Sequence, residues 1–128
     1  EGMNKERKWP FYFTEKKARS YGKSLKRRRQ LKRFFGSDLN LDIMMSHAAP
    51  DIGGFYGDLG SHHLPSKALG EIQKEFMPPL WLYGHIHPSY TTEDLDFKKK
   101  DSYILNAVPF KVIRYDEKKK KVMDYYPR

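Results

Sequence analysis

Cysteine is absent from the 128 residues, which excludes disulfide bonds and metal sites built on thiolates. Any metal would therefore be held by nitrogen and oxygen ligands. No apolar run approaches the length of a bilayer span, and the first residues do not resemble a signal peptide. We therefore expect an intracellular protein, located in the cytoplasm and not associated with a membrane.

Acidic residues are scarce at one end of the chain. Residues 1–34 contain 13 Lys and Arg against 3 acids, whereas the remaining residues contain 12 against 13. The formal net charge of +9 therefore belongs to the N-terminal quarter. With 38% hydrophobic residues, the chain has enough apolar surface for one modest domain and is too short for two well-packed ones.

The basic segment predicts a helix over residues 14–35, with Thr14 as its N-cap and Gly36 at its end. One side of this helix carries a loose apolar stripe, and the opposite side is almost entirely Lys and Arg. The dense run over residues 16–33 indicates an anionic partner, either nucleic acid or an acidic protein surface. The candidate contacts are Lys23, Lys26, Arg27, Arg28, Arg29, Lys32 and Arg33. A basic face that only keeps the helix solvated is the alternative interpretation.

The rest of the chain alternates between apolar runs and turns. Residues 41–45 predict a strand covered on both faces, and residues 80–83 predict a second buried strand, with a helix at 66–77 between them. Glycine-rich residues 46–63 predict a long loop of the kind that lines a site, and residues 88–101 a polar connection. Further strands are expected at 102–106, 110–115 and 122–126, the last two joined by a solvated turn at 116–121. This order predicts an α/β sandwich with a mixed sheet, preceded by the basic helix.

Histidine is also scarce, with five residues in all, yet three of them follow the two predicted strands. His47 follows "LDIMMS", while His85 and His87 follow "LWLYG". A right-handed crossover would bring both strand ends to one edge of a parallel sheet, where α/β proteins bind ligands. Gly84 is expected to supply a sharp turn there. Either loop alone is better explained as an ordinary hydrogen-bonded loop, but the two together indicate a metal site at which three imidazoles gather.

The stretch "DIMMSHAAP" followed by "PLWLYGHIH" resembles the second half of the calcineurin-like metallophosphoesterase family. In that family a strand ends in a Ser/Thr-His loop, a helix follows, and the next strand ends in Gly-His-x-His. The resemblance covers roughly residues 40–115 and includes "SYILNAV", which looks like the strand after the second loop. It implies that residues 37–128 form the C-terminal half of a metallophosphoesterase-like α/β sandwich, with residues 1–36 as a basic lead-in and helix.

The resemblance implies hydrolysis of a phosphate ester, as in a phosphatase or a phosphodiesterase, with two divalent metal ions in the complete domain. Carried over by position, His47 and His85 would ligate one metal and His87 the other. His85 and His87 would then act in catalysis through the metals. Imidazole ligands suit Mn, Fe, Zn, Ni or Co.

The family's remaining ligands are absent from this sequence. They come from Asp-x-His, Gly-Asp-x-x-Asp and Gly-Asn-His motifs upstream of the two histidine loops, and no Asp-x-His occurs here. The chain alone is therefore expected to be inactive, with the N-terminal half truncated or supplied as a separate chain. The first candidates for replacement ligands are Asp42, Asp51 and Asp58, whereas His62 and His63 are expected at the surface.

Two further interpretations of the chain stay open. It is either a non-catalytic remnant of such a domain, acting as a structural or RNA-binding module in a larger assembly, or a small protein that holds a single metal. The basic helix favours the former, because clustered Lys and Arg bind phosphates without reading sequence. The intact histidine loops favour the phosphoesterase interpretation over both.

Overall fold

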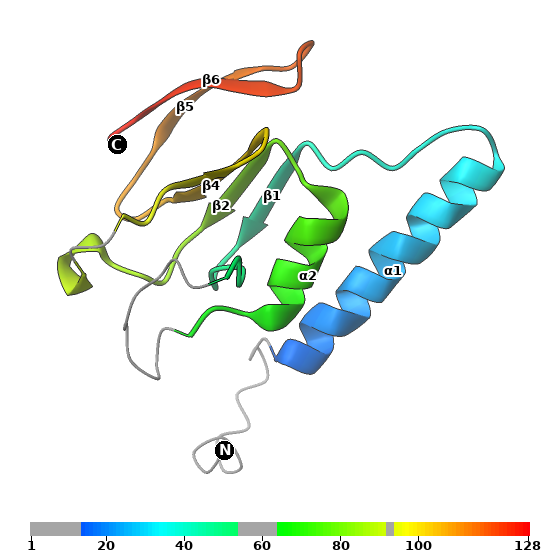
Figure 1. Cartoon of the computed structure of the whole chain (residues 1–128), viewed down its shortest axis with the longest axis horizontal. Coiled ribbons are helices and arrows are strands. Elements are labelled where there is room, and N and C mark those ends of the chain that lie inside the picture. Colours follow the sequence, from blue (N-terminus) through cyan, green and yellow to red (C-terminus); the bar gives the residue numbers. More distant parts are fainter. Residues whose placement is uncertain (1–13, 54–63, 92–93) are drawn as a thin grey trace.

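The computed structural model of the chain describes residues 14–53, 64–91 and 94–128. Two α-helices, six strands and one short 3-10 helix make up this part of the chain (Figure 1). In chain order they are α1 (Glu15–Phe34), β1 (Ile43–Ser46), α2 (Lys67–Phe76), β2 (Leu80–Tyr83), η2 (Pro88–Tyr90), β3 (Phe97–Lys99), β4 (Ser102–Asn106), β5 (Val112–Asp116) and β6 (Lys121–Tyr126).

The central sheet has the strand order β1-β2-β4-β3. β1, β2 and β4 run parallel, and β3 pairs antiparallel with β4. The unit β1-α2-β2 is thus the crossover predicted from the sequence, and the predicted α/β class with a mixed sheet is confirmed. Since β1 and β2 are parallel neighbours, the segments that follow them leave the sheet on the same side, at the carboxyl ends of the strands.

Three layers surround two apolar cores (Figure 1). α1 and α2 lie on one side of the sheet, and the hairpin of β5 and β6 lies on the other. Trp81 and Ile104 belong to the core between the sheet and the helices, and both are completely buried. Leu80, Leu105 and Val122 form the smaller core between the sheet and the hairpin. Burying apolar side chains on both faces of β2 and β4 is what joins the layers.

Side-chain caps set the beginning of both helices. Thr14 Oγ1 accepts the Lys17 backbone N–H at 3.2 Å, and Ser66 Oγ accepts that of Leu69 at 3.2 Å. Glu15, in the first turn of α1, also accepts the Ala68 N–H at 2.9 Å, so α1 helps to cap α2. The predicted helices over 14–35 and 66–77 are confirmed to within a residue at each end.

The prediction that residues 41–45 form a strand covered on both faces is wrong. In the sheet formed by the described residues β1 is an edge strand, and Ile43 and Met45 are 47% and 75% exposed. The sequence shows only an apolar run, whereas burial depends on how many strands and layers surround it. The polar connection over 88–101 contains η2 and β3, which the sequence did not indicate. Of the predicted loop over 46–63, residues 54–63 lie outside the described residues.

Within the described part of the chain, none of the helices has the length and apolar composition needed to cross a membrane.

Candidate functional site

Two imidazoles meet where β1 and β2 end. Ser46 pairs with Tyr83 in the parallel register, and the Gly84 N–H then donates to the His47 carbonyl at 3.1 Å. Immediately beyond, His47 Nε2 lies 3.0 Å from His85 Nδ1, and the two ring planes meet at 65°. This is the proximity predicted from the sequence for these two side chains. Both side chains are exposed to solvent.

His85 has an unusual backbone. Its φ is +65°, and the Ile86 N–H donates to the Gly84 carbonyl at 2.7 Å, which closes a γ-turn with His85 at its centre. Gly84, expected to provide the sharp turn, is outside the positive-φ region. Turns of this kind are rare and strained in L-residues, and such strain concentrates at functional sites. The strain is therefore located on the histidine that faces His47.

The third predicted ligand does not join the pair. Ile86 is almost completely buried, and His87 follows it as an exposed residue at the start of η2. Among residues 14–53, 64–91 and 94–128, no group of three or more His, Cys, Asp or Glu side chains is close enough to hold a metal. The described residues thus contain a pair of imidazoles, rather than the cluster of three expected from the sequence.

The buried side-chain amide of Asn106 holds the loop that carries His85. Asn106, at the end of β4, is almost completely buried, and its Nδ2 donates to the Ile86 carbonyl at 2.7 Å. Its Oδ1 accepts the Val108 N–H at 2.7 Å, so both ends of the amide are satisfied. Sequence reasoning missed Asn106. The signal that could have found it is a polar residue ending the otherwise apolar run of a buried strand.

The loop that carries His47 is fixed on the helix side of the sheet. Trp81 Nε1 donates to Ser46 Oγ at 2.8 Å, and that hydroxyl donates to the Ala48 carbonyl at 2.7 Å. Further along, Ser66 exchanges backbone hydrogen bonds with Ala49 and Asp51, at 2.8 and 2.9 Å. Both histidine loops are therefore positioned by hydrogen bonds that are buried or partly buried, although the imidazoles themselves are exposed.

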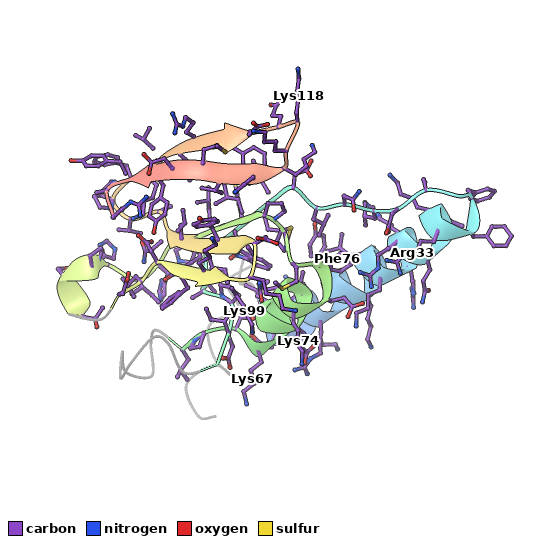
Figure 2. All side chains as sticks on the ribbon, turned by 45° about the horizontal axis from the view of Figure 1, so that its top comes forward. Arg33, Lys67, Lys74, Phe76, Lys99 and Lys118 are labelled. Carbon is purple, nitrogen blue, oxygen red and sulfur yellow. The ribbon has the colours of Figure 1, made fainter. Side chains whose placement is uncertain are left out.

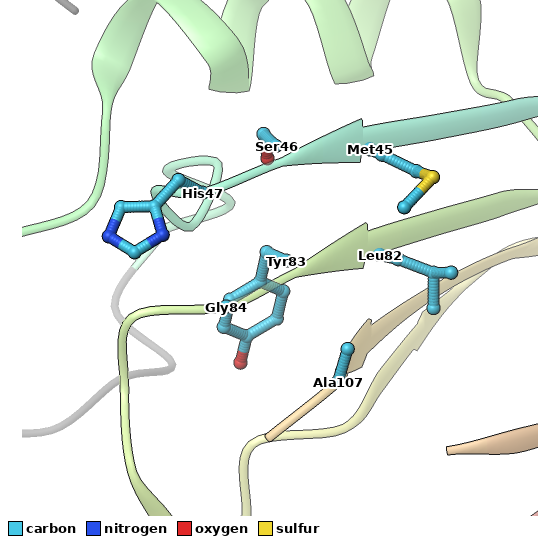
Figure 3. Close-up of a pocket in the computed structure, with 7 residues that line it drawn as sticks. All are labelled: Met45, Ser46, His47, Leu82, Tyr83, Gly84 and Ala107. Carbon is cyan, nitrogen blue, oxygen red and sulfur yellow. The ribbon is translucent and has the colours of Figure 1, made fainter. Parts of the chain in front are cut away.

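An open pocket of about 410 Å³ adjoins the pair on the side of the sheet that faces the hairpin (Figure 3). Met45, Leu82 and Ala107 give it an apolar floor, and His47 lies at one end. The remaining lining residues are Ser46, Tyr83 and Gly84. A ligand bound by the imidazoles would thus have an apolar surface beside it.

The candidate carboxylates lie elsewhere. Asp42 precedes β1, at the end of the strand opposite His47, and pairs with Lys120 at 2.9 Å. This contact raises the pKa of Lys120 above its usual value. Asp51 accepts the Gly53 N–H at 3.0 Å, in a turn of its own loop. Asp58, His62 and His63 lie outside the described residues.

The seven basic candidates on α1 fall into two groups. Arg29 donates to Glu75 and lies 4.5 Å from the centre of the Phe76 ring, so it joins α1 to α2. Arg33 makes two hydrogen bonds of 3.1 Å to Asp38. These arginines hold the pKa values of Glu75 and Asp38 below their usual range. The other candidates are exposed to solvent: Lys23, Lys26, Arg27, Arg28 and Lys32.

Comparisons of this chain with protein-family models, with curated proteins and with solved structures gave no match.

Proposed function

We propose that this chain supplies two metal ligands, His47 and His85, to a calcineurin-like metallophosphoesterase site that hydrolyses a phosphate ester. The observation that carries the proposal is the 3.0 Å separation of His47 Nε2 and His85 Nδ1 at the carboxyl ends of adjacent parallel strands. Open α/β sheets bind ligands at this edge. The order β1, α2, β2, followed by Gly-His-x-His, supports the assignment to the C-terminal half of such a sandwich.

The two imidazoles fit part of a metal site. Metal–imidazole bonds are about 2.0–2.1 Å long, so two ring nitrogens 3.0 Å apart are close enough to share an ion. Zn, Mn, Fe, Ni and Co all accept such ligands. Because no third ligating side chain joins the pair within the described residues, the other ligands have to come from elsewhere. His87 remains the candidate ligand of a second ion.

The outer edge of β1 offers a place for the rest of the domain. Among the residues that the structure describes, β1 is the outermost strand of the sheet, and its Ile43 and Met45 side chains are exposed. Edge strands with unpaired backbone groups accept a further strand. We infer that the complementary half, in the same longer chain or in a separate one, extends the sheet beyond β1 and brings carboxylate ligands close to His47.

The chain's own contribution is to position the metal ligands. The γ-turn at His85 and the amide of Asn106 fix one imidazole, and the Trp81–Ser46 hydrogen bond supports the loop of the other. The open pocket beside His47 gives a bound ligand an apolar surface on one side. A bound divalent ion would supply Lewis-acid polarisation of the phosphate oxygens.

A second candidate function is a non-catalytic remnant of such a domain that serves as a structural or RNA-binding module. The absence of a third ligand among the described residues and the exposed basic side chains of α1 favour it. Metal binding separates the two candidates. Only the phosphoesterase candidate gives His47 and His85 a role as metal ligands, so an ion bound by this pair favours it over the remnant.

Metal binding by variants of the three histidines tests the proposal. Equilibrium dialysis against zinc or manganese, followed by elemental analysis, should detect one ion bound by the parent chain. His47→Ala and His85→Asn should each weaken binding by about tenfold or more, and asparagine is chosen because it tolerates a left-handed backbone. His87→Ala is the matched control and should retain this ion. Unchanged binding by His85→Asn would exclude the site.

Hydrolysis of bis-para-nitrophenyl phosphate tests whether the chain is complete. With manganese added, we expect negligible turnover by residues 1–128, because a pair of imidazoles does not hold a bridged metal pair. Robust turnover that His85→Asn abolishes would show that ligands within this sequence complete the site. Asp58 would then be the first residue to replace.

A further inference from the structure

The outward side of α1 carries cations that its neighbours do not neutralise. Residues 15–34 contain ten Lys and Arg and one acid, Glu15, giving a net charge of +9. Carboxylates pair with Arg19, Arg29 and Arg33. Across the part of the chain that the structure describes, no acidic side chain forms an ion pair with the remaining candidates, which are Lys23, Lys26, Arg27, Arg28 and Lys32.

The helix divides into a packing side and an outer side. Ala18, Gly22 and Leu25 are buried, and they lie on the side that packs against α2. Arg27 follows Ala18 by nine residues, and at 3.6 residues per turn this places it about 180° away. Residues four or seven apart lie on the same side of an α-helix. The outer side around Arg27 therefore also carries Lys23, Leu31 and Phe34.

Aromatic rings accompany these cations at the C-terminal end of α1. Phe34 and Phe35 are 82% and 76% exposed, and Leu31 is 61% exposed. The two rings are perpendicular, with centroids 5.3 Å apart. This end of the helix projects beyond α2 in Figure 1. Exposed aromatic rings beside cations are the combination with which proteins bind unpaired bases.

We propose that this outer surface of α1 binds single-stranded nucleic acid. It consists of Lys23, Arg27, Arg28, Phe34 and Phe35. The cations contact phosphates of the backbone, which gives affinity without sequence preference. The two phenyl rings stack on bases that a single strand leaves accessible. This surface is separate from the histidine pair, so the inference does not depend on the proposed phosphoesterase function.

The rings distinguish a single strand from a duplex. In a duplex the bases are already stacked on one another, so Phe34 and Phe35 would find only the backbone. Binding of a duplex would then depend only on the attraction between the cations of α1 and the phosphates. A single strand in RNA or DNA offers both phosphates and accessible bases to the same short surface. The exposed apolar area at the end of α1 therefore favours the single strand.

Fluorescence anisotropy with labelled oligo(U), oligo(dT) and a DNA duplex tests the proposal. The parent chain should bind both single strands more tightly than the duplex. With three phosphate contacts, log K for single strands should fall by about 2 for each tenfold rise in salt. Phe34→Ala/Phe35→Ala should weaken single-strand binding by about tenfold or more while leaving the salt dependence unchanged. Arg27→Glu/Arg28→Glu should weaken binding to all three probes and reduce the salt dependence.

Lys118→Glu/Lys119→Glu is the matched control. It makes the same change in charge at the turn between β5 and β6, outside α1 (Figure 2), and should leave binding nearly unchanged. His47→Ala should also bind as the parent does. Failure of the parent to bind any probe at low salt would overturn the proposal, and so would equal affinity for the duplex. Parental affinity in the Phe34→Ala/Phe35→Ala variant, with circular dichroism showing an intact fold, would exclude the stacking role.

Discussion

Replacing Gly70 with alanine should destabilise the protein, although alanine is the better helix former by about 1 kcal/mol. A Cβ on Gly70 would lie 2.1 Å from the Asp51 carbonyl oxygen and 2.9 Å from its carbon. Ordinary contacts begin near 3.4 Å, so α2 or the loop after His47 has to move by more than about 1 Å. Overpacking of this kind costs about 1–3 kcal/mol, and a rigid backbone neighbour places it at the upper end. After the gain in helix propensity is subtracted, the free energy of unfolding of Gly70→Ala should be about 2 kcal/mol lower than that of the parent.

Urea unfolding followed by circular dichroism measures this loss. With a slope of about 2 kcal/mol per molar urea, the midpoint of the Gly70→Ala variant should fall by about 1 M. Gly22→Ala is the control, because its Cβ would meet only the side chain of Ile72, at 3.0 Å, and that side chain is able to shift. Gly22→Ala should change the free energy of unfolding by less than about 1 kcal/mol. A midpoint for Gly70→Ala equal to or above that of the parent would refute the close approach of α2 to the histidine loop.

Two other predictions concern single side chains. Glu75→Gln should lower stability at neutral pH. Because Arg29 holds the pKa of Glu75 below its usual 4.5, the contribution is present above that pH and is lost as the pH falls through the lower, folded-state pKa. Urea midpoints of parent and variant should therefore converge in acid, and a gap that persists there would contradict the ion pair. Asn106→Ala leaves the Ile86 carbonyl and the Val108 N–H without their partner and should cost about 2–4 kcal/mol in the same assay. A loss below about 1 kcal/mol would mean that water replaces the amide.

Local chemistry made the helices and the inner strands predictable. Thr14 and Ser66 are capping residues placed just before the first turns, and both act as caps in the structure. The apolar runs over 80–83 and 102–106 form β2 and β4 with the same bounds, because each is buried between two layers. In these segments the local preference and the tertiary environment agree.

Features that depend on distant neighbours were not predictable. Nothing in the apolar run of β1 indicates that it is the last strand, so the exposure of Met45 could not be foreseen. β3 contains two lysines and pairs with β4 through a turn in which Lys100 has a φ of +55°. Lysine is not a typical turn residue, so that hairpin gives no sequence signal. The sequence likewise does not distinguish Arg29 from its basic neighbours, because its ion pair with Glu75 depends on how α2 packs against α1.

The candidate site was predictable in part. The apolar runs and the βαβ order were enough to bring His47 and His85 together, because parallel strands end at one edge. The position of His87 depended on the γ-turn at His85, and the sequence assigned that turn to Gly84 instead. A glycine in a motif indicates where a turn is permitted, but here the residue with positive φ is His85, next to the buried Ile86.

Zinc titration followed by NMR of the histidine imidazoles tests the central claim most directly. The ring signals of His47 and His85 should shift together and report one dissociation constant, because a single ion contacts both rings. Those of His87 should remain unchanged over that range of zinc, since His87 does not share the ion. Shifts of all the imidazoles in parallel, or no shift of His47 and His85, would contradict a metal site built on this pair.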